Sequence, residues 1–121
     1  YEVLSGKDEG HIDFMMTIKG DGGLVRSEVN MYIHESTYCD LLKSFHLPTF
    51  HKYYRIYHVG GHEIEVCHVD DGLNEDFYYA EVEFDNEADA KAYAWPFGEA
   101  KDVTGNPYFQ MKNFWRRTYR Q

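Results

Sequence analysis

The feature that most constrains this chain is an alternation of apolar and polar residues with a period of two. In the first such segment one face is apolar and consists of Ile12, Phe14, Met16 and Ile18. The other face of that segment consists of Asp13, Met15, Thr17 and Lys19. This pattern is typical of a β-strand with one apolar and one polar face, and its recurrence favours antiparallel β-structure.

Glycine-rich turns connect the alternating segments. Gly22-Gly23 and Gly60-Gly61 each stand between two of them, as expected for hairpins. A further loop is expected at Asp70-Asp71-Gly72. The strands predicted in this way are approximately 12–19, 25–33, 52–59, 62–69 and 77–84.

Three helices are expected beside these strands. Ser36 or Thr37 would cap the first, whose apolar side is formed by Tyr38, Leu41, Leu42 and Phe45. Asp85 or Asn86 would cap the second, which is expected to run to about Tyr93. Asn106-Pro107 would open the third, which carries Tyr108, Met111, Phe114 and Trp115. The order β-β-α-β-β-β-α-α predicts an α+β fold.

Size and charge limit the functions that such a fold can have. The 121 residues fit a single domain, and no apolar run reaches the roughly 20 residues of a membrane-spanning helix. The formal net charge of -9 disfavours general nucleic-acid binding, because phosphates are repelled at long range. Cys39 and Cys67 are expected to be reduced thiols of a cytoplasmic protein. Since the chain begins with Tyr1 and not Met, we expect that an N-terminal stretch has been lost.

The polar strand faces carry an unusual set of charges. Acidic and basic residues recur two positions apart, as in Arg26 and Glu28, Glu63 and Glu65, and Glu81 and Glu83. Carboxylates on one sheet face repel unless a cation lies between them, and Mg²⁺ or Mn²⁺ prefers such oxygen ligands. Lys and Arg on the same face would bind phosphate oxygens. The alternative is a solvated face with surface ion pairs of little energetic value.

Histidines provide a rival metal signal around the second hairpin. His51, His58, His62 and His68 lie near Gly60-Gly61, and three of them could share a face. Their spacing does not match a structural zinc site, so scattered histidines are the favoured interpretation.

The segment Ala80-Glu81-Val82-Glu83-Phe84 and the residues after it resemble the CYTH, or triphosphate tunnel metalloenzyme, superfamily. The resemblance continues through Trp95-Pro96 and Asp102-Val103-Thr104-Gly105-Asn106-Pro107. Upstream, Thr17-Ile18-Lys19-Gly20, Arg26-Ser27-Glu28 and Tyr54-Arg55-Ile56 follow the order of the family's strands. About 110 residues are covered in all.

The resemblance implies a curved antiparallel sheet or partial β-barrel whose interior binds triphosphates through Mg²⁺ or Mn²⁺. It implies that Glu81 and Glu83 are catalytic metal ligands and that Glu28 and Glu65 lie near the metal. Lys19, Arg26 and Arg55 would bind phosphate, and Lys52 would replace Arg55 if the strand register were shifted by one.

This chain also departs from the family pattern. The opening Glu-x-Glu-x-Lys strand is absent, Asn30 stands in place of a glutamate, and Cys67 stands in place of an aspartate. Two functions therefore stay open for a single domain, 1–121, that lacks its first strand. One is a metal-dependent triphosphatase acting on a small-molecule triphosphate. The other is a degenerate module that binds a phosphorylated ligand or a protein partner without cleaving it.

Overall fold

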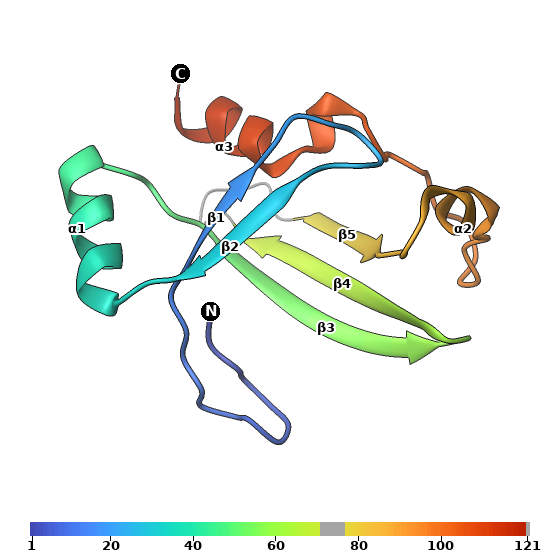
Figure 1. The fold of residues 1–121 in the computed structure, drawn as a ribbon, viewed down its shortest axis with the longest axis horizontal. Coiled ribbons are helices and arrows are strands. Elements are labelled where there is room, and N and C mark those ends of the chain that lie inside the picture. Colours follow the sequence, from blue (N-terminus) through green and yellow to red (C-terminus); the bar gives the residue numbers. More distant parts are fainter. Residues whose placement is uncertain (71–76, 121) are drawn as a thin grey trace. The chain divides into compact units, whose positions relative to one another are not determined.

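The predicted order of strands and helices is confirmed (Figure 1). A computed structural model describes residues 1–70 and 77–120, so the expected loop at Asp71-Gly72 lies outside the described residues. The elements are β1 (Met15–Lys19), β2 (Glu28–Tyr32), α1 (Glu35–Phe45), β3 (His51–Val59), β4 (His62–Asp70), β5 (Phe77–Val82), α2 (Glu87–Ala92), a 3₁₀ turn η1 (Pro107–Phe109) and α3 (Met111–Tyr119). The protein is therefore of the α+β class.

The chain forms two compact units. The first unit comprises Tyr1–Pro48 and Val103–Gln121, and the second comprises Thr49–Asp102. Each unit has its own antiparallel sheet, β1–β2 in the first and β3–β4–β5 in the second. Neither sheet closes into a barrel within the described ranges 1–70 and 77–120.

In the first unit, β1 and β2 pair in the expected hairpin. Lys19 lies opposite Glu28, and Thr17 lies opposite Asn30, so these polar residues share one face. The apolar face pairs Ile18 with Val29, and both side chains are more than half exposed. The alternation therefore predicted correctly which residues share a face.

Helix α1 begins earlier than its sequence indicated. The N-cap residue is His34, which makes no side-chain capping bond, and the first intrahelical bond runs from the Tyr38 N–H to the His34 carbonyl. The prediction that Ser36 or Thr37 caps the helix was wrong, because both lie within its first turn. The residue before the cap is tied to the hairpin, because the Ile33 N–H donates to the Phe14 carbonyl at 2.9 Å.

The C-terminal segment contains a break that the sequence pattern did not predict. Asn106 caps η1 as expected, its side chain accepting a hydrogen bond from the Tyr108 N–H at 3.0 Å. A separate helix, α3, then starts after Gln110. At the break the backbone of Gln110 is extended, with φ of −72° and ψ of 132°. The Asn113 side chain donates to the Pro107 carbonyl at 2.7 Å, an acceptor that a continuous helix would pair with a backbone N–H.

Helix α3 is anchored within the first unit by several contacts. Phe114 is buried, with 1% of its surface exposed. The indole Nε1 of Trp115 donates to the Pro48 carbonyl at 2.9 Å. The Nζ of Lys112 lies 3.6 Å from Oδ1 of Asp21. The helix therefore contacts the loop after β1 and the C-terminal end of the unit's longer segment.

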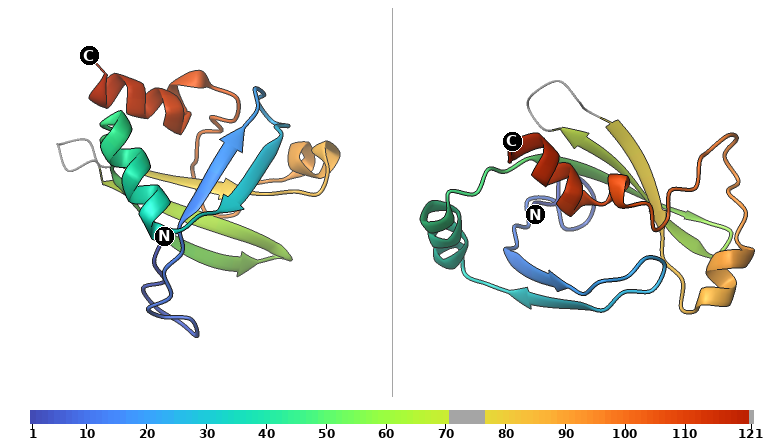
Figure 2. Two further views of the ribbon diagram at one scale, coloured as in Figure 1. Left: turned by 60° about the vertical axis from the view of Figure 1, so that its left-hand side comes forward. Right: turned by 90° about the horizontal axis from the view of Figure 1, so that it is seen from above.

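In the second unit, β4 is the central strand and β3 and β5 are the edges (Figure 2). Among the residues of this unit that the structure describes, the buried side chains are Ile64, Cys67 and Val69, and all three lie on β4. Gly60 and Gly61 form the β3–β4 turn with φ of 58° and 81°, a conformation that favours glycine. The sheet is thus built around one central, well-covered strand.

Helix α2 follows the last strand directly. Asn86 caps it, because the Asn86 Oδ1 accepts a hydrogen bond from the Asp89 N–H at 2.8 Å. Of the two predicted capping residues, Asn86 is therefore confirmed. The helix ends at Ala92, one residue before the expected end.

Candidate functional site

Two glutamates meet directly across the β3–β4–β5 sheet. Glu65 of β4 pairs with Glu81 of β5, and residues directly opposite in an antiparallel pair point to the same face. Glu63 lies two residues from Glu65 on that same face, opposite His58 of β3. Glu83 follows β5, and its charge also acts on Glu65. The second unit therefore concentrates carboxylates at one end of a single face.

We call this surface the glutamate face. Its central and flanking members are Lys52, Tyr54, Glu63, Glu65, Cys67, Tyr79 and Glu81. The other surface of the sheet, the opposite face, carries Tyr53, Arg55, Tyr57, His62, Ile64, His68 and Tyr78.

The carboxylates of the glutamate face repel one another. The pKa of Glu65 is raised above its ordinary value, first by partial burial and then by the negative charges of Glu81, Glu83 and Glu63. Lys52 acts in the other direction and lowers that pKa. Glu65 therefore lies where a bound cation would relieve an existing repulsion.

Lys52 supplies positive charge to the same face. It pairs with Val69 of β4, four residues along the strand from Glu65. Its Nζ lies 5.0 Å from the ring centroid of Tyr54 and 5.5 Å from that of Tyr79. Both distances are within the range of a cation–π interaction, so the rings hold the ammonium group above the middle of the face.

Arg55 does not belong to this arrangement. It pairs with Val66, whereas its neighbours Tyr54 and Ile56 pair with Cys67 and Glu65. Because successive side chains of a strand point to opposite faces, Arg55 lies on the opposite face. The register therefore places Lys52, and not Arg55, on the face of Glu65 and Glu81, and phosphate binding by either residue stays a prediction.

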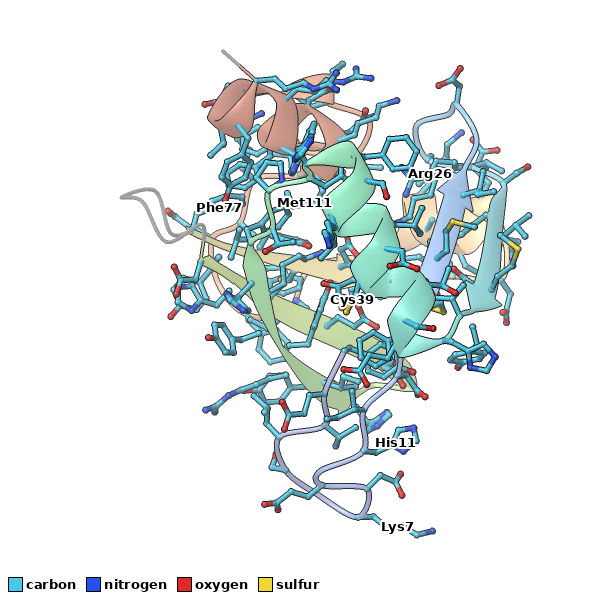
Figure 3. All side chains as sticks on the ribbon, turned by 90° about the vertical axis from the view of Figure 1, so that its left-hand side faces the viewer. Lys7, His11, Arg26, Cys39, Phe77 and Met111 are labelled. Atoms are coloured by element: carbon cyan, nitrogen blue, oxygen red, sulfur yellow. The ribbon has the colours of Figure 1, made fainter. Side chains whose placement is uncertain are left out.

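Between Lys52 and the glutamates lies a row formed by Tyr54, Cys67 and Tyr79. Cys67 is 1% exposed, and burial raises the pKa of its thiol, so it is a poor nucleophile. Burial likewise raises the pKa of Tyr79, and its interaction with the Cys67 thiol raises it further. The other cysteine, Cys39, is a free thiol exposed on α1 (Figure 3).

The remaining expected site residues belong to the first unit. Lys19 Nζ lies 3.4 Å from Glu28 Oε2. The pKa of Glu28 is lowered, first by a hydrogen bond from Asn30 and then by the charges of Lys19 and Arg26. Arg26 lies just before β2 (Figure 3). Lys19, Arg26 and Glu28 thus form a local cluster of their own on the polar side of the hairpin.

No complete metal-ligand set is assembled in the described part of the chain. Residues 1–70 and 77–120 contain no group of three or more His, Cys, Asp or Glu side chains arranged to hold a metal ion. The histidines divide between the two faces of the sheet, with His58 on the glutamate face and His62 and His68 on the opposite face. His58, His62 and His68 therefore do not share one face.

Three site residues were not selected from the sequence. Glu63, Tyr54 and Tyr79 are not among the metal ligands and phosphate-binding residues that the sequence predicts. The strand register identifies the two tyrosines, because both pair with Cys67 and their rings therefore lie beside Lys52. A register of this kind depends on tertiary pairing and is not visible in a single segment.

Comparison with protein families, with curated proteins and with solved structures finds no match to this chain. Among the helices of the described residues, none combines the length and apolar character needed to cross a membrane.

Proposed function

We propose that this chain binds a polyphosphate anion together with a divalent cation on the glutamate face of the β3–β4–β5 sheet. The observation that carries the proposal is the direct opposition of Glu65 and Glu81, with Lys52 on the same face. Mg²⁺ is commonly held by one or two carboxylates, several waters and the phosphates of its ligand. Two glutamates are therefore enough protein ligands once the polyphosphate supplies its own oxygens.

The roles of the side chains follow from their charge. Glu65 and Glu81 would hold Mg²⁺ or Mn²⁺, with Glu83 and Glu63 adding negative potential beside it. Lys52 would bind phosphate oxygens that the metal does not reach. In the first unit, Lys19, Arg26 and Glu28 would form a second charged cluster of the same domain.

The fold that accompanies this proposal is a partial triphosphate-tunnel barrel of the CYTH kind, with the glutamate face as part of its inner wall. In its stronger form, the proposal is that the protein also cleaves the bound triphosphate. The metal would polarise the terminal phosphoryl group, and Lys52 would neutralise the charge that develops. A cytoplasmic location suits the two free thiols.

Thermal melting tests the binding proposal. Tripolyphosphate added together with Mg²⁺ or Mn²⁺ should raise the melting temperature, because a ligand that binds only the folded state stabilises it. The double variant Glu65→Gln/Glu81→Gln should lose that shift, while Glu99→Gln, an exposed carboxylate elsewhere in the second unit, should keep it. An unchanged shift in the double variant would exclude the glutamate face. Release of phosphate, measured in parallel, distinguishes cleavage from binding alone.

A second candidate function is that of a protein-binding module. Strand β3 is an edge strand whose side chains on both faces are largely exposed, including Tyr53 at 46% and Ile56 at 53%. Exposed aromatic and aliphatic edge residues are typical of strands that pair with a partner. The absence of any tripolyphosphate shift, with or without metal, would favour this function.

A further inference from the structure

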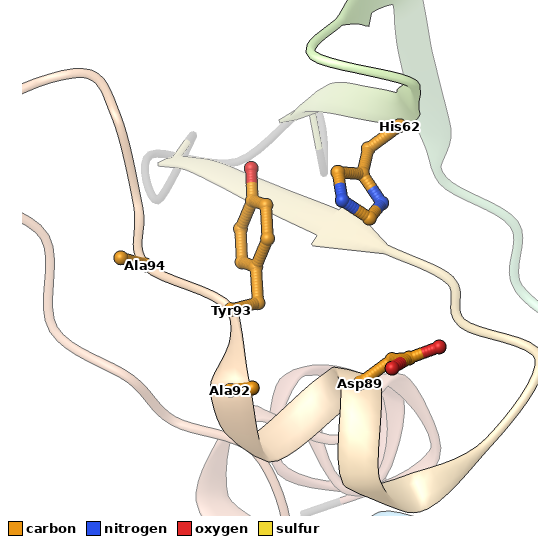
Figure 4. A pocket seen from close by; sticks show the side chains of 5 residues that line it. All are labelled: His62, Asp89, Ala92, Tyr93 and Ala94. Carbon is orange, nitrogen blue, oxygen red and sulfur yellow. The ribbon is translucent and has the colours of Figure 1, made fainter.

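A pocket lies in the second unit, away from the glutamate face. It is a shallow pocket of about 290 Å³ lined by His62, Asp89, Ala92, Tyr93 and Ala94 (Figure 4). His62 is the first residue of β4 and belongs to the opposite face of the sheet. The remaining lining residues come from α2 and the two positions that follow it.

Aromatic rings form the wall of this pocket. The rings of His62 and Tyr93 are 5.1 Å apart at an angle of 74°, and Phe84 packs against both, at 5.3 Å from His62 and 5.2 Å from Tyr93. Each ring is thus held by two others. The pocket therefore has a fixed π-surface, which is the kind of surface that attracts a cation.

The charges around the pocket also select a cation. Figure 4 shows the Asp89 carboxylate on α2 and the imidazole of His62 at the start of β4, both lining the pocket. Asp89 Oδ2 accepts a hydrogen bond from Asn86 Nδ2 at 2.7 Å, which fixes its position. The nearest basic residue of the helix, Lys91, is already paired with Glu87 at 2.8 Å. The pocket also adjoins the C-terminal end of α2, where backbone carbonyls lack helical partners and favour positive charge.

The small residues of the lining indicate the shape of the ligand. Ala92 and Ala94 leave room beside the rings for an unbranched apolar stem. We infer that this pocket binds a primary alkylammonium group, with the ammonium at Asp89 and the stem against Tyr93 and the two alanines. The same chemistry occurs in free polyamines and in the lysine side chain. A net charge of -9 concentrates such cations near the protein.

Nuclear magnetic resonance titration with n-butylammonium chloride tests the inference. The side-chain signals of His62, Tyr93, Ala92 and Ala94 should shift together, with a dissociation constant on the order of millimolar for so small a ligand. 1-Butanol has the same stem without the charge, and butyrate has the opposite charge, so neither should produce these shifts. Equal shifts with butanol would overturn the inference.

Variants of the lining locate the ammonium group. Asp89→Asn preserves the geometry around Asn86 but should weaken binding by about tenfold, the loss expected for one charge-assisted hydrogen bond. Tyr93→Phe retains the π-surface and should bind as the parent does, whereas Tyr93→Leu should not. Glu99→Gln removes one charge elsewhere and is the control for net charge. Parent-like binding by Asp89→Asn would overturn the inference.

Two further titrations complete the experiment. Spermidine and Nα-acetyl-lysine methylamide, titrated separately, show whether the pocket prefers a free polyamine or a lysine side chain. Glu65→Gln/Glu81→Gln should bind n-butylammonium normally, because those residues lie on the other surface of the sheet. Loss of butylammonium binding in that double variant would show that the cation binds at the glutamates and not in this pocket.

Discussion

Glu65 is the residue whose environment most affects the behaviour of the empty protein. Its pKa is raised by partial burial and by three neighbouring glutamates. Between the ordinary pKa and this raised value, the folded state binds more protons than the unfolded state. Stability due to Glu65 is therefore present at lower pH and is lost as the pH rises through its raised pKa.

Replacement of this side chain should consequently stabilise the metal-free protein. Glu65→Gln removes a like charge directly opposite Glu81, which should raise stability by about 0.2–1 kcal/mol at neutral pH. The gain should disappear in acid, where Glu65 of the parent is protonated. Melting temperatures measured across the acidic to neutral range check this. A lower stability of the variant at neutral pH would contradict the repulsion between these glutamates.

A second prediction at this scale concerns the two basic residues of β3. Lys52→Met should weaken binding of tripolyphosphate with Mg²⁺ by about tenfold or more, the usual cost of losing a hydrogen bond to a charged group. Arg55→Met should have little effect, because Arg55 lies on the opposite face. Calorimetric titration of both variants makes the comparison. The reverse ranking would mean that the ligand binds the other surface of the sheet.

These two residues also show what the sequence could predict about the site. The alternation correctly placed Glu65 and Glu81 on polar strand faces, and their direct pairing is now visible. It did not distinguish Lys52 from Arg55, because a shift of one residue exchanges the two faces of a strand. Only pairing with β4 decides between them, and that pairing is a tertiary property.

At the scale of elements, the sequence predicted the strands more accurately than the ends of the helices. The Gly60-Gly61 hairpin and the five strands appear in the predicted order, since period-two alternation and glycine turns are local signals. The start of α1 and the break at Gln110 were not predicted. The residue before the α1 cap is held by a contact between distant residues, the pairing of Ile33 with Phe14, whereas the break at Gln110 accompanies a local hydrogen bond from the Asn113 side chain to the Pro107 carbonyl.

The cap of α2 provides a prediction at this scale. Asn86→Ala removes the acceptor for the Asp89 N–H and should cost about 0.5–2 kcal/mol of stability. Asn86→Ser should recover most of that loss, because a serine oxygen can accept the same hydrogen bond. Chemical denaturation of the three proteins measures the difference. Equal stability of the alanine and serine variants would show that the cap contributes nothing.

At the scale of the whole molecule, negative charge is the dominant property. The net charge of -9 destabilises the folded state by self-repulsion, which any salt relieves by screening. Two effects of Mg²⁺ must therefore be distinguished, general screening and binding at the glutamate face. The division into two units bears on this, because Lys19 and Arg26 belong to one unit and the glutamate face to the other.

A comparison at equal ionic strength separates these effects. MgCl₂ should raise the melting temperature more than NaCl does, and Glu65→Gln/Glu81→Gln should remove the excess while leaving the NaCl response unchanged. The physical reason is that screening depends on all the charges, whereas binding depends on the opposed pair. If both salts act equally on the parent protein, the glutamate face holds no metal in the absence of a polyphosphate.

The two thiols differ in accessibility, so the rates at which they are alkylated report on the opening of the second unit. Cys39 is exposed and should react with an alkylating reagent at once, while Cys67, at 1% exposure, reacts only when β4 becomes accessible. The delay between the first and second labels on the intact chain thus times the opening of the second unit, without any engineered probe. Since Cys67 lies in the row next to Glu65, occupancy of the glutamate face should lengthen that delay.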